Sequence, residues 1–412
     1  MIQALIRKGV RIPNPESIEL APEVDVRRIL PGATIHAGCR IRGADTLICA
    51  RAEIGKETPA TVENCLIGPD AELKGGYFKG SVFLKRASVG SGAQVRDGSI
   101  LEEEASAAHI AGLKQTILFP FVTLGSLVNF CDCLMAGGTG KKNHSEVGSS
   151  YIHFNFTPQQ DKATPSLIGD VAHGVMINQA PIFLGGQGGL VGPCRLAYGT
   201  VIAAGTINRK DELRPGRLIF GGSGKSGNAP YHGGLVYRNI KRIVLHNLHY
   251  IAGLQALRHW YEYVRSLFIS EIMPDELYNG LVRTLDACID ERIRRLGEFA
   301  DKMPESLKNY QASAGQGASD TLLSQKRQLY DNWSRLEQEL RTGGPAVESP
   351  EKRDAFIKRI RDQIQASGSY DYVAVIRSLD PDAAAAGTDW LMEIIESLTG
   401  RWLSMVPAFN SA

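Results

Sequence analysis

The stretch GGLVGPCRLAYGTVIAAGTIN, residues 188–208, places an aliphatic residue at every sixth position: Leu190, Leu196 and Ile202. A period of six matches neither the 3.6-residue turn of an α-helix nor the alternation of a simple strand. It is typical of a triangular solenoid, in which each short strand points one aliphatic side chain inward. Small residues make the sharp corners of such a coil.

The same spacing returns earlier in the chain, in LIGPDAEL (residues 66–73) and in SVGSGAQV (residues 88–95). We expect residues 20–215 to form about ten coils of parallel strands, in a prism about 50 Å long. An antiparallel sandwich, the alternative, would not keep one spacing in separate places. The side chains expected inside are Ile67, Leu73, Val89, Val95, Leu196 and Ile202.

Three segments interrupt the period: residues 102–115, 137–165 and 178–189. Insertions in a solenoid emerge as loops and leave its core intact. Since loops often carry function, we expect chemistry in these segments.

The second half of the chain has a helical period. Its expected helices are 238–267, 274–296, 320–341, 350–364 and 382–403, with a mobile linker at 311–319. The sequence thus predicts three parts: a β-helix over 1–220, a Gly-rich connector over 221–237 and an α-helical domain over 238–412. The apolar stripes of the helices indicate a core or a subunit interface rather than a cofactor site.

The composition excludes several classes of protein. A formal net charge of +2 argues against a nucleic-acid partner, which usually requires a basic surplus. Seven scattered cysteines form neither a disulfide framework nor a paired zinc site. The most apolar stretch, residues 116–136, contains Pro120 and Asp132, which favours strands over a membrane span. No signal peptide is recognised, so we expect a cytoplasmic protein without a membrane partner.

The first half resembles the left-handed β-helix of the bifunctional N-acetylglucosamine-1-phosphate uridyltransferase/glucosamine-1-phosphate acetyltransferase family. The opening KGVRIPNPESIELAPEVDV and the block from Ser166 to Asp211 carry the resemblance, which covers about residues 8–212. No Gly-rich, Arg-containing nucleotide loop precedes the repeats, so we do not expect pyrophosphorylase activity. The resemblance implies a left-handed β-helix, acetyl-CoA or another acyl-CoA as co-substrate, and a homotrimer with active sites between neighbouring prisms.

The resemblance also implies site residues. In the family a histidine within a Lys-x-Gly-His-x-x-Tyr turn acts as general base. GKKNHSEV aligns His144 with that base, but Asn143 replaces the glycine and Val147 the tyrosine. The remaining implied contacts are Lys141, Lys142 and Lys162 for the substrate, and Asn155, Phe156 and Ala203 for acyl-CoA.

The residue chemistry is compatible with this role. An imidazole with a pKa of about 6.5 can accept a proton from an amine or hydroxyl at neutral pH. The alternative is that His144 is a solvated loop histidine. A zinc site built from His144, His153 and His173 lacks the close histidine pair of trimeric β-helical carbonic anhydrases, so no metal is expected.

Two functions stay open at this point. The first is a hexapeptide-repeat acyltransferase that acts on a sugar or nucleotide sugar. The second is a non-catalytic trimer that senses a ligand or acts as a scaffold, with the C-terminal helices recruiting a protein partner. His144 and Asn155 favour the enzyme, whereas Val147 at the expected tyrosine position favours the scaffold.

Overall fold

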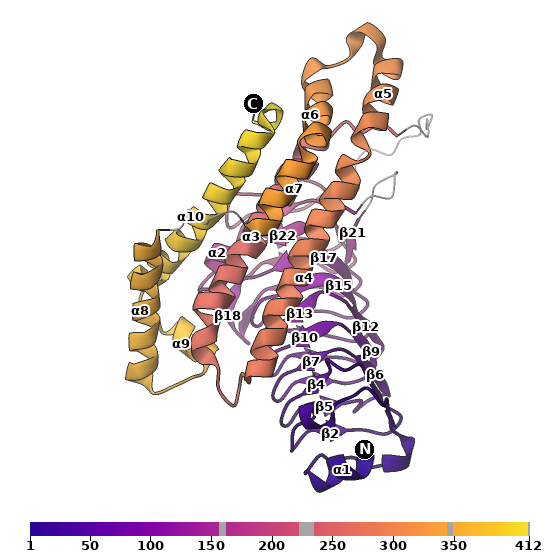
Figure 1. Cartoon of the computed structure of the whole chain (residues 1–412), viewed down its shortest axis with the longest axis vertical. Coiled ribbons are helices and arrows are strands. Elements are labelled where there is room, and N and C mark those ends of the chain that lie inside the picture. The colour runs from indigo at the N-terminus through magenta and orange to yellow at the C-terminus, as the bar shows by residue number, and fades with distance from the viewer. Residues whose placement is uncertain (156–161, 222–234, 344–348, 411–412) are drawn as a thin grey trace.

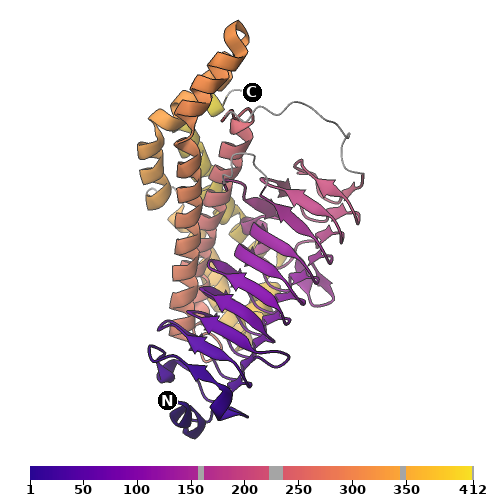
Figure 2. The same ribbon diagram turned by 90° about the vertical axis from the view of Figure 1, so that its right-hand side faces the viewer.

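The computed structural model describes residues 1–155, 162–221, 235–343 and 349–410. A short helix, α1 (Ile2–Arg7), lies at the N-terminal end of a left-handed parallel β-helix, and long helices run along one side of that β-helix (Figures 1 and 2). The predicted fold class, a left-handed β-helix followed by a helical region, is therefore confirmed.

The β-helix has three flat faces, each a ladder of parallel strands. Face 1 contains β1 (Glu19–Leu20), β3 (Arg40–Arg42), β6 (Ala60–Glu63), β9 (Gly76–Lys79), β12 (Ala93–Arg96), the first part of β15 (Gly112–Leu118) and of β17 (Asn129–Met135), β21 (Ile152–Phe154), β24 (Gly189–Val191) and β27 (Ile207–Asn208). Face 2 contains β4 (Leu47–Ile48), β7 (Leu66–Ile67), β10 (Ser81–Phe83), β13 (Ser99–Leu101), the second part of β15 and β17, β22 (Ser166–Ile168) and β25 (Arg195–Leu196).

Face 3 is a ten-stranded sheet, which agrees with the predicted number of coils. Its strands are β2 (Thr34–Ile35), β5 (Glu53–Ile54), β8 (Glu72–Leu73), β11 (Ser88–Val89), β14 (Ser106–Ala107), β16 (Thr123–Leu124), β20 (Glu146–Val147), β23 (Phe183–Leu184), β26 (Val201–Ile202) and β28 (Leu218–Ile219).

The repeated aliphatic side chains fill the interior of the β-helix. All six residues expected inside are at most 2% exposed. Val89 aligns with Leu73, and Ile202 with Leu184, so aliphatic residues stack from coil to coil. The six-residue period therefore predicted the core correctly.

The interruptions of the period differ in structure. The expectation of a loop at residues 102–115 is wrong, because β14 and the start of β15 continue the regular coil there. Small side chains such as Ala105 and Ala107 fill the inward positions, which hid the repeat. Real insertions lie between Face 2 and Face 3: a hairpin of β18 (Gly138–Gly140) and β19 (Asn143–His144), and the short helix α2 (Val171–Gly174).

The C-terminal region is helical, as predicted. Its helices are α3 (Ile240–Tyr263), α4 (Asp275–Ala300), α5 (Met303–Ala314), α6 (Asp320–Asp331), α7 (Trp333–Thr342), α8 (Pro350–Ser367), α9 (Tyr372–Arg377) and α10 (Pro381–Met405). The expected helix 320–341 is two helices that meet at Asn332, and α5 occupies part of the expected linker. Most of the expected Gly-rich connector, residues 222–234, lies outside the described residues.

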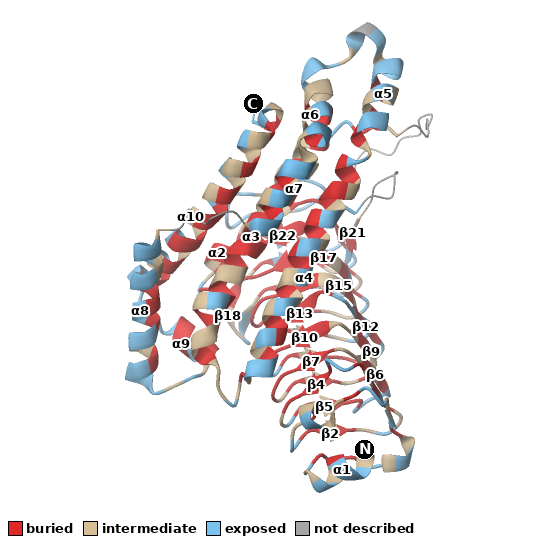
Figure 3. Ribbon diagram, in the orientation of Figure 1, coloured by how far each residue is buried: buried red, intermediate tan, exposed pale blue. Residues whose placement is uncertain are grey.

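Two of these helices cover Face 2. Helix α4 contacts β7, β10 and β13, and α3 contacts β22. A side chain at Gly280 of α4 would overlap Leu66 of β7, which shows how closely the helix approaches the sheet. In Figure 3 the exposed residues of α8 lie on its outer side, and buried residues line the inner surfaces of the helices. Face 2 is therefore internal, whereas Faces 1 and 3, in the described residues, meet solvent along most of their length.

Candidate functional site

His144 lies on the β18–β19 hairpin, at the edge between Face 2 and Face 3 (the hairpin edge). Gly137 and Gly138 have positive φ angles of 107° and 99°, which let the chain leave the coil sharply. Gly138 then pairs with His144 in the antiparallel hairpin. Three predicted site residues, Lys141, Lys142 and His144, are thereby held on one hairpin.

The ring of His144 has a defined orientation. Its Nδ1 lies 2.8 Å from the carbonyl oxygen of Lys141. Because a carbonyl only accepts, Nδ1 carries the proton and donates it. The lone pair of the neutral ring is therefore on Nε2, which lies 3.7 Å from a carboxylate oxygen of Glu146. This arrangement suits a general base, since the carboxylate can stabilise the imidazolium that forms.

The three lysines expected to contact the substrate are in different situations. The Nζ atom of Lys141 pairs with Glu104 at 3.1 Å, and Lys142 is exposed. Lys162 is also exposed, but it lies in the connection between β21 and β22, at the other edge of Face 2. Lys162 is therefore not brought to the hairpin within one chain.

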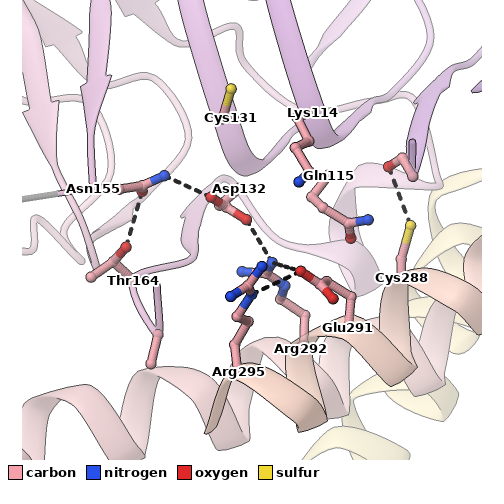
Figure 4. A network of polar contacts seen from close by, with 12 residues as sticks. Lys114, Gln115, Cys131, Asp132, Asn155, Thr164, Cys288, Glu291, Arg292 and Arg295 are labelled. Atoms are coloured by element: carbon pink, nitrogen blue, oxygen red, sulfur yellow. Dashed lines mark hydrogen bonds and ion pairs between the residues drawn. The ribbon is translucent and has the colours of Figure 1, made fainter. Parts of the chain in front are cut away.

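Asn155 lies at the edge between Face 1 and Face 2, where α4 closes over the solenoid (the α4 edge). Its Nδ2 donates to Asp132 at 2.6 Å, and its Oδ1 accepts from Thr164 at 2.9 Å. The other oxygen of Asp132 pairs with Arg292 of α4 at 2.6 Å. Figure 4 shows this chain of contacts from the solenoid to the helix. Both polar atoms of the Asn155 side chain are thus engaged within the protein.

The other expected contacts with acyl-CoA do not gather at this edge. Ala203 lies at the corner between Face 3 and Face 1, with its amide donating to Ile219 at 2.9 Å. Phe156 lies outside the described residues. His144, Asn155 and Ala203 occupy three different corners of one prism, so a site that uses all three needs more than one copy of the chain.

The other histidines considered for zinc have separate environments. His153 is buried, contacts Ser166 at 2.8 Å, and burial lowers its pKa to about 4. A hydrogen bond to Asp170 raises the pKa of His173. Among the described residues, no group of three or more His, Cys, Asp or Glu side chains could hold a metal ion.

Two cations on Face 1 were not predicted as site residues. Arg96 of β12 and Lys114 of β15 are register partners on adjacent coils. Neither has an ion pair within the described ranges, and like charges on neighbouring strands are unfavourable. Comparing outward positions one coil apart would have revealed the pair in the sequence.

Across the parts of the chain that the structure describes, no helix combines the length and apolar composition needed to cross a bilayer.

Comparison with known proteins matches the β-helical half. The chain is 26% identical over 207 residues to the bifunctional protein GlmU of Nitratidesulfovibrio vulgaris, 50% of this chain and 40% of that protein. The GlmU proteins of Thermus thermophilus and Clavibacter sepedonicus are both 28% identical, over 190 and 211 residues, 46% and 51% of this chain.

The similarity has clear limits. No family model matches the chain. The chain spans about two fifths of the length of the GlmU proteins that it matches. Sequence and fold together show a resemblance to the hexapeptide-repeat β-helix of the GlmU family.

Proposed function

We propose that this protein transfers an acyl group from acyl-CoA to a sugar or nucleotide sugar, with His144 as the general base. The observation that carries the proposal is the hydrogen bond from Nδ1 of His144 to the Lys141 carbonyl, which leaves Nε2 as the proton acceptor. Glu146, at 3.7 Å from Nε2, stabilises the charged ring. The similarity to GlmU proteins supports the same reaction class.

The proposed reaction is direct acyl transfer. The acceptor amine or hydroxyl gives its proton to Nε2 of His144 as it attacks the thioester carbon. The tetrahedral intermediate then collapses, the carbon–sulfur bond breaks, and the imidazolium returns the proton to the CoA thiolate. Lys141, Lys142 and Lys162 are proposed to contact the acceptor. Asn155, Phe156 and Ala203 are proposed to mark the path of acyl-CoA, through residues of neighbouring copies.

The proposed assembly is a homotrimer. The helices cover Face 2, so contacts between copies fall on the other faces. Phe183, Val201 and Leu218 align outward on the last coils of Face 3 and are 39%, 38% and 61% exposed. Earlier outward positions of that face are polar, for example Glu53 and Glu72. An apolar ladder of this kind is suited to contact another subunit.

Light scattering tests the assembly. The expected mass is three times 44.8 kDa, and Val201→Glu should lower it because a charge would be buried at the contact. Glu53→Gln, on the polar part of the same face, is the control and should leave the mass unchanged. A monomer at micromolar concentration would contradict the trimer and the shared site.

Thiol release from acetyl-CoA tests the reaction, with a panel of amino sugars and nucleotide sugars as acceptors. His144→Ala should lower turnover by about two to four orders of magnitude, the usual contribution of a positioned general base. Asn143→Ala, the neighbour on the hairpin, is the matched control and should keep most of the activity. Equal low rates for the wild type and His144→Ala would reject the enzyme.

A non-catalytic ligand-sensing or scaffolding trimer is the second candidate. One observation favours it. Asn155, the residue expected to contact acyl-CoA, uses both polar side-chain atoms in hydrogen bonds with Asp132 and Thr164. Under this candidate the helical domain recruits a protein partner. Absence of acetyl-CoA binding in calorimetry would support it over the acyltransferase.

A further inference from the structure

A cavity of about 360 Å³ lies at the seam between α9 and the hairpin edge. The solenoid contributes Phe121 and the hairpin residues Gly140 and Lys141, and α9 contributes Val373 and Arg377. Lys141 also provides the carbonyl that holds the His144 ring. The cavity therefore adjoins the hairpin that carries the proposed catalytic residue, and it is completed by a helix of the C-terminal region.

Most charges around this cavity are already neutralised. Lys85 pairs with Asp371 at 2.7 Å, and Lys141 pairs with Glu104 at 3.1 Å. The carboxylate of Glu103 is satisfied by the buried guanidinium of Arg265 at 2.6 Å. These pairs account for every carboxylate that lines the cavity.

Arg377 is the remaining charge. In residues 1–155, 162–221, 235–343 and 349–410, no carboxylate lies within ion-pairing distance of its guanidinium. The guanidinium lies against the hairpin, since a Cβ placed on Gly140 would be 3.7 Å from its Nη1 atom. The cavity thus has one cation without an ion pair within the described ranges, and this exposed arginine lies beside the hairpin that carries His144.

The rest of the lining is suited to a small organic molecule. Phe121 and Val373 are 4% and 9% exposed and give the cavity an apolar wall. A planar guanidinium binds a carboxylate or phosphate through two parallel hydrogen bonds. An apolar wall with a few fixed polar groups is the usual composition of a small-molecule site.

We propose that this cavity binds the anionic group, phosphate or carboxylate, of a small molecule, and that Arg377 recognises that group. The inference rests on the proposed function in one respect: the bound molecule is the acceptor whose amine or hydroxyl reaches His144. The helical domain then determines acceptor specificity, a role that the β-helix alone cannot perform because Arg377 lies on α9.

Acceptor kinetics test the proposal. Thiol release from acetyl-CoA is measured with glucosamine, glucosamine 6-phosphate and glucosaminic acid. Arg377→Gln should raise the KM for the two anionic acceptors about tenfold to a hundredfold, the effect of losing a charge-assisted hydrogen bond. Its kcat and its KM for glucosamine should stay close to those of the wild type. If only one of the two anionic acceptors is affected, that acceptor identifies the anionic group.

Two variants control for general effects. Arg377→Lys keeps the charge without the planar fork and should give an intermediate KM. Arg359→Gln removes an exposed arginine from the outer surface of α8 and should leave every KM unchanged. If Arg359→Gln raised the KM for the anionic acceptors equally, the rise would come from the loss of net positive charge. That result would overturn the proposal that Arg377 binds the anionic group.

Measurements of ligand binding distinguish a failure of the cavity site from a failure of the proposed acyl-transfer reaction. If the wild type releases no thiol with any acceptor, the proposed function fails, and calorimetry with glucosamine 6-phosphate and glucosaminic acid decides the inference. Wild-type binding that weakens in Arg377→Gln supports the cavity site without the reaction. No binding of either probe by the wild type, or equal affinity of Arg377→Gln, overturns it.

Discussion

The two edges of Face 2 have opposite character. At the α4 edge, Asp132 and Arg292 form an ion pair with side chains 9% and 3% exposed, and Asn155 is bound into the same network. At the hairpin edge, the His144 side chain is 25% exposed and a cavity lies beside its hairpin. Docking of the helices has closed the α4 edge at Asp132 and has left the hairpin edge accessible at His144.

This difference separates polar groups that are buried in the protein from polar groups that a ligand can reach. A buried ion pair gives little net stability over apolar packing, but the loss of one partner leaves a charge without compensation. The Asp132–Arg292 pair therefore fixes α4 on the solenoid. The hairpin edge has a fixed ring, a nearby carboxylate and room for a ligand, which are the requirements of a site.

The largest expected effect on stability is at the α4 edge. Arg292→Ala leaves the carboxylate of Asp132 buried without its cation, so we expect a loss of about 3 kcal/mol in the free energy of unfolding. Denaturant unfolding followed by circular dichroism measures this loss.

A neighbouring arginine provides the control. Arg294 on the same helix pairs with Glu291 and Glu298 but is 48% exposed. Exposed pairs contribute about 0–1 kcal/mol, so Arg294→Ala should have a small effect. Similar losses for both variants would contradict the description of the α4 edge as a buried clamp.

A smaller, pH-dependent effect is expected where α3 covers the solenoid near the hairpin edge. Glu102 is buried and accepts a hydrogen bond from Tyr261 at 2.6 Å. Burial raises the pKa of Glu102 from 4.5 to about 7, against the opposing effect of Arg265. The folded state therefore keeps a proton that the unfolded state releases, and this contribution to stability decreases as the pH rises from about 4.5 to 7.

Glu102→Gln removes this titration and keeps an oxygen for Tyr261. The variant should melt higher than the wild type at about pH 8, and the difference should shrink at about pH 5. Scanning calorimetry at both pH values measures the two differences. A difference that does not change with pH would show that Glu102 is ionised under the helix.

The sequence predicted the regular parts of the molecule better than their contacts. The six-residue period identified the buried residues Ile67 and Leu196, because each coil repeats the same environment. The helical period located α3 and α4, but not the face that they cover. That depends on pairs such as Glu103–Arg265, which are 162 positions apart in the chain.

The candidate site was predicted in the same uneven way. Similarity to a family motif identified His144, and the hairpin that orients it follows local glycines. Arg377 and Arg292 could not be found, because a single charged residue on a helix has no distinctive spacing. Their importance comes from what they contact after the helices dock.

The most direct test measures thiol release and melting temperature together for His144→Ala and Arg292→Ala. The account predicts a separation: His144→Ala loses turnover by about two to four orders of magnitude and keeps its melting temperature. Arg292→Ala melts lower and, below its transition with saturating acetyl-CoA, keeps its turnover number. Full turnover by His144→Ala, in a protein that is as stable as the wild type, would contradict the assignment of chemistry to the hairpin edge.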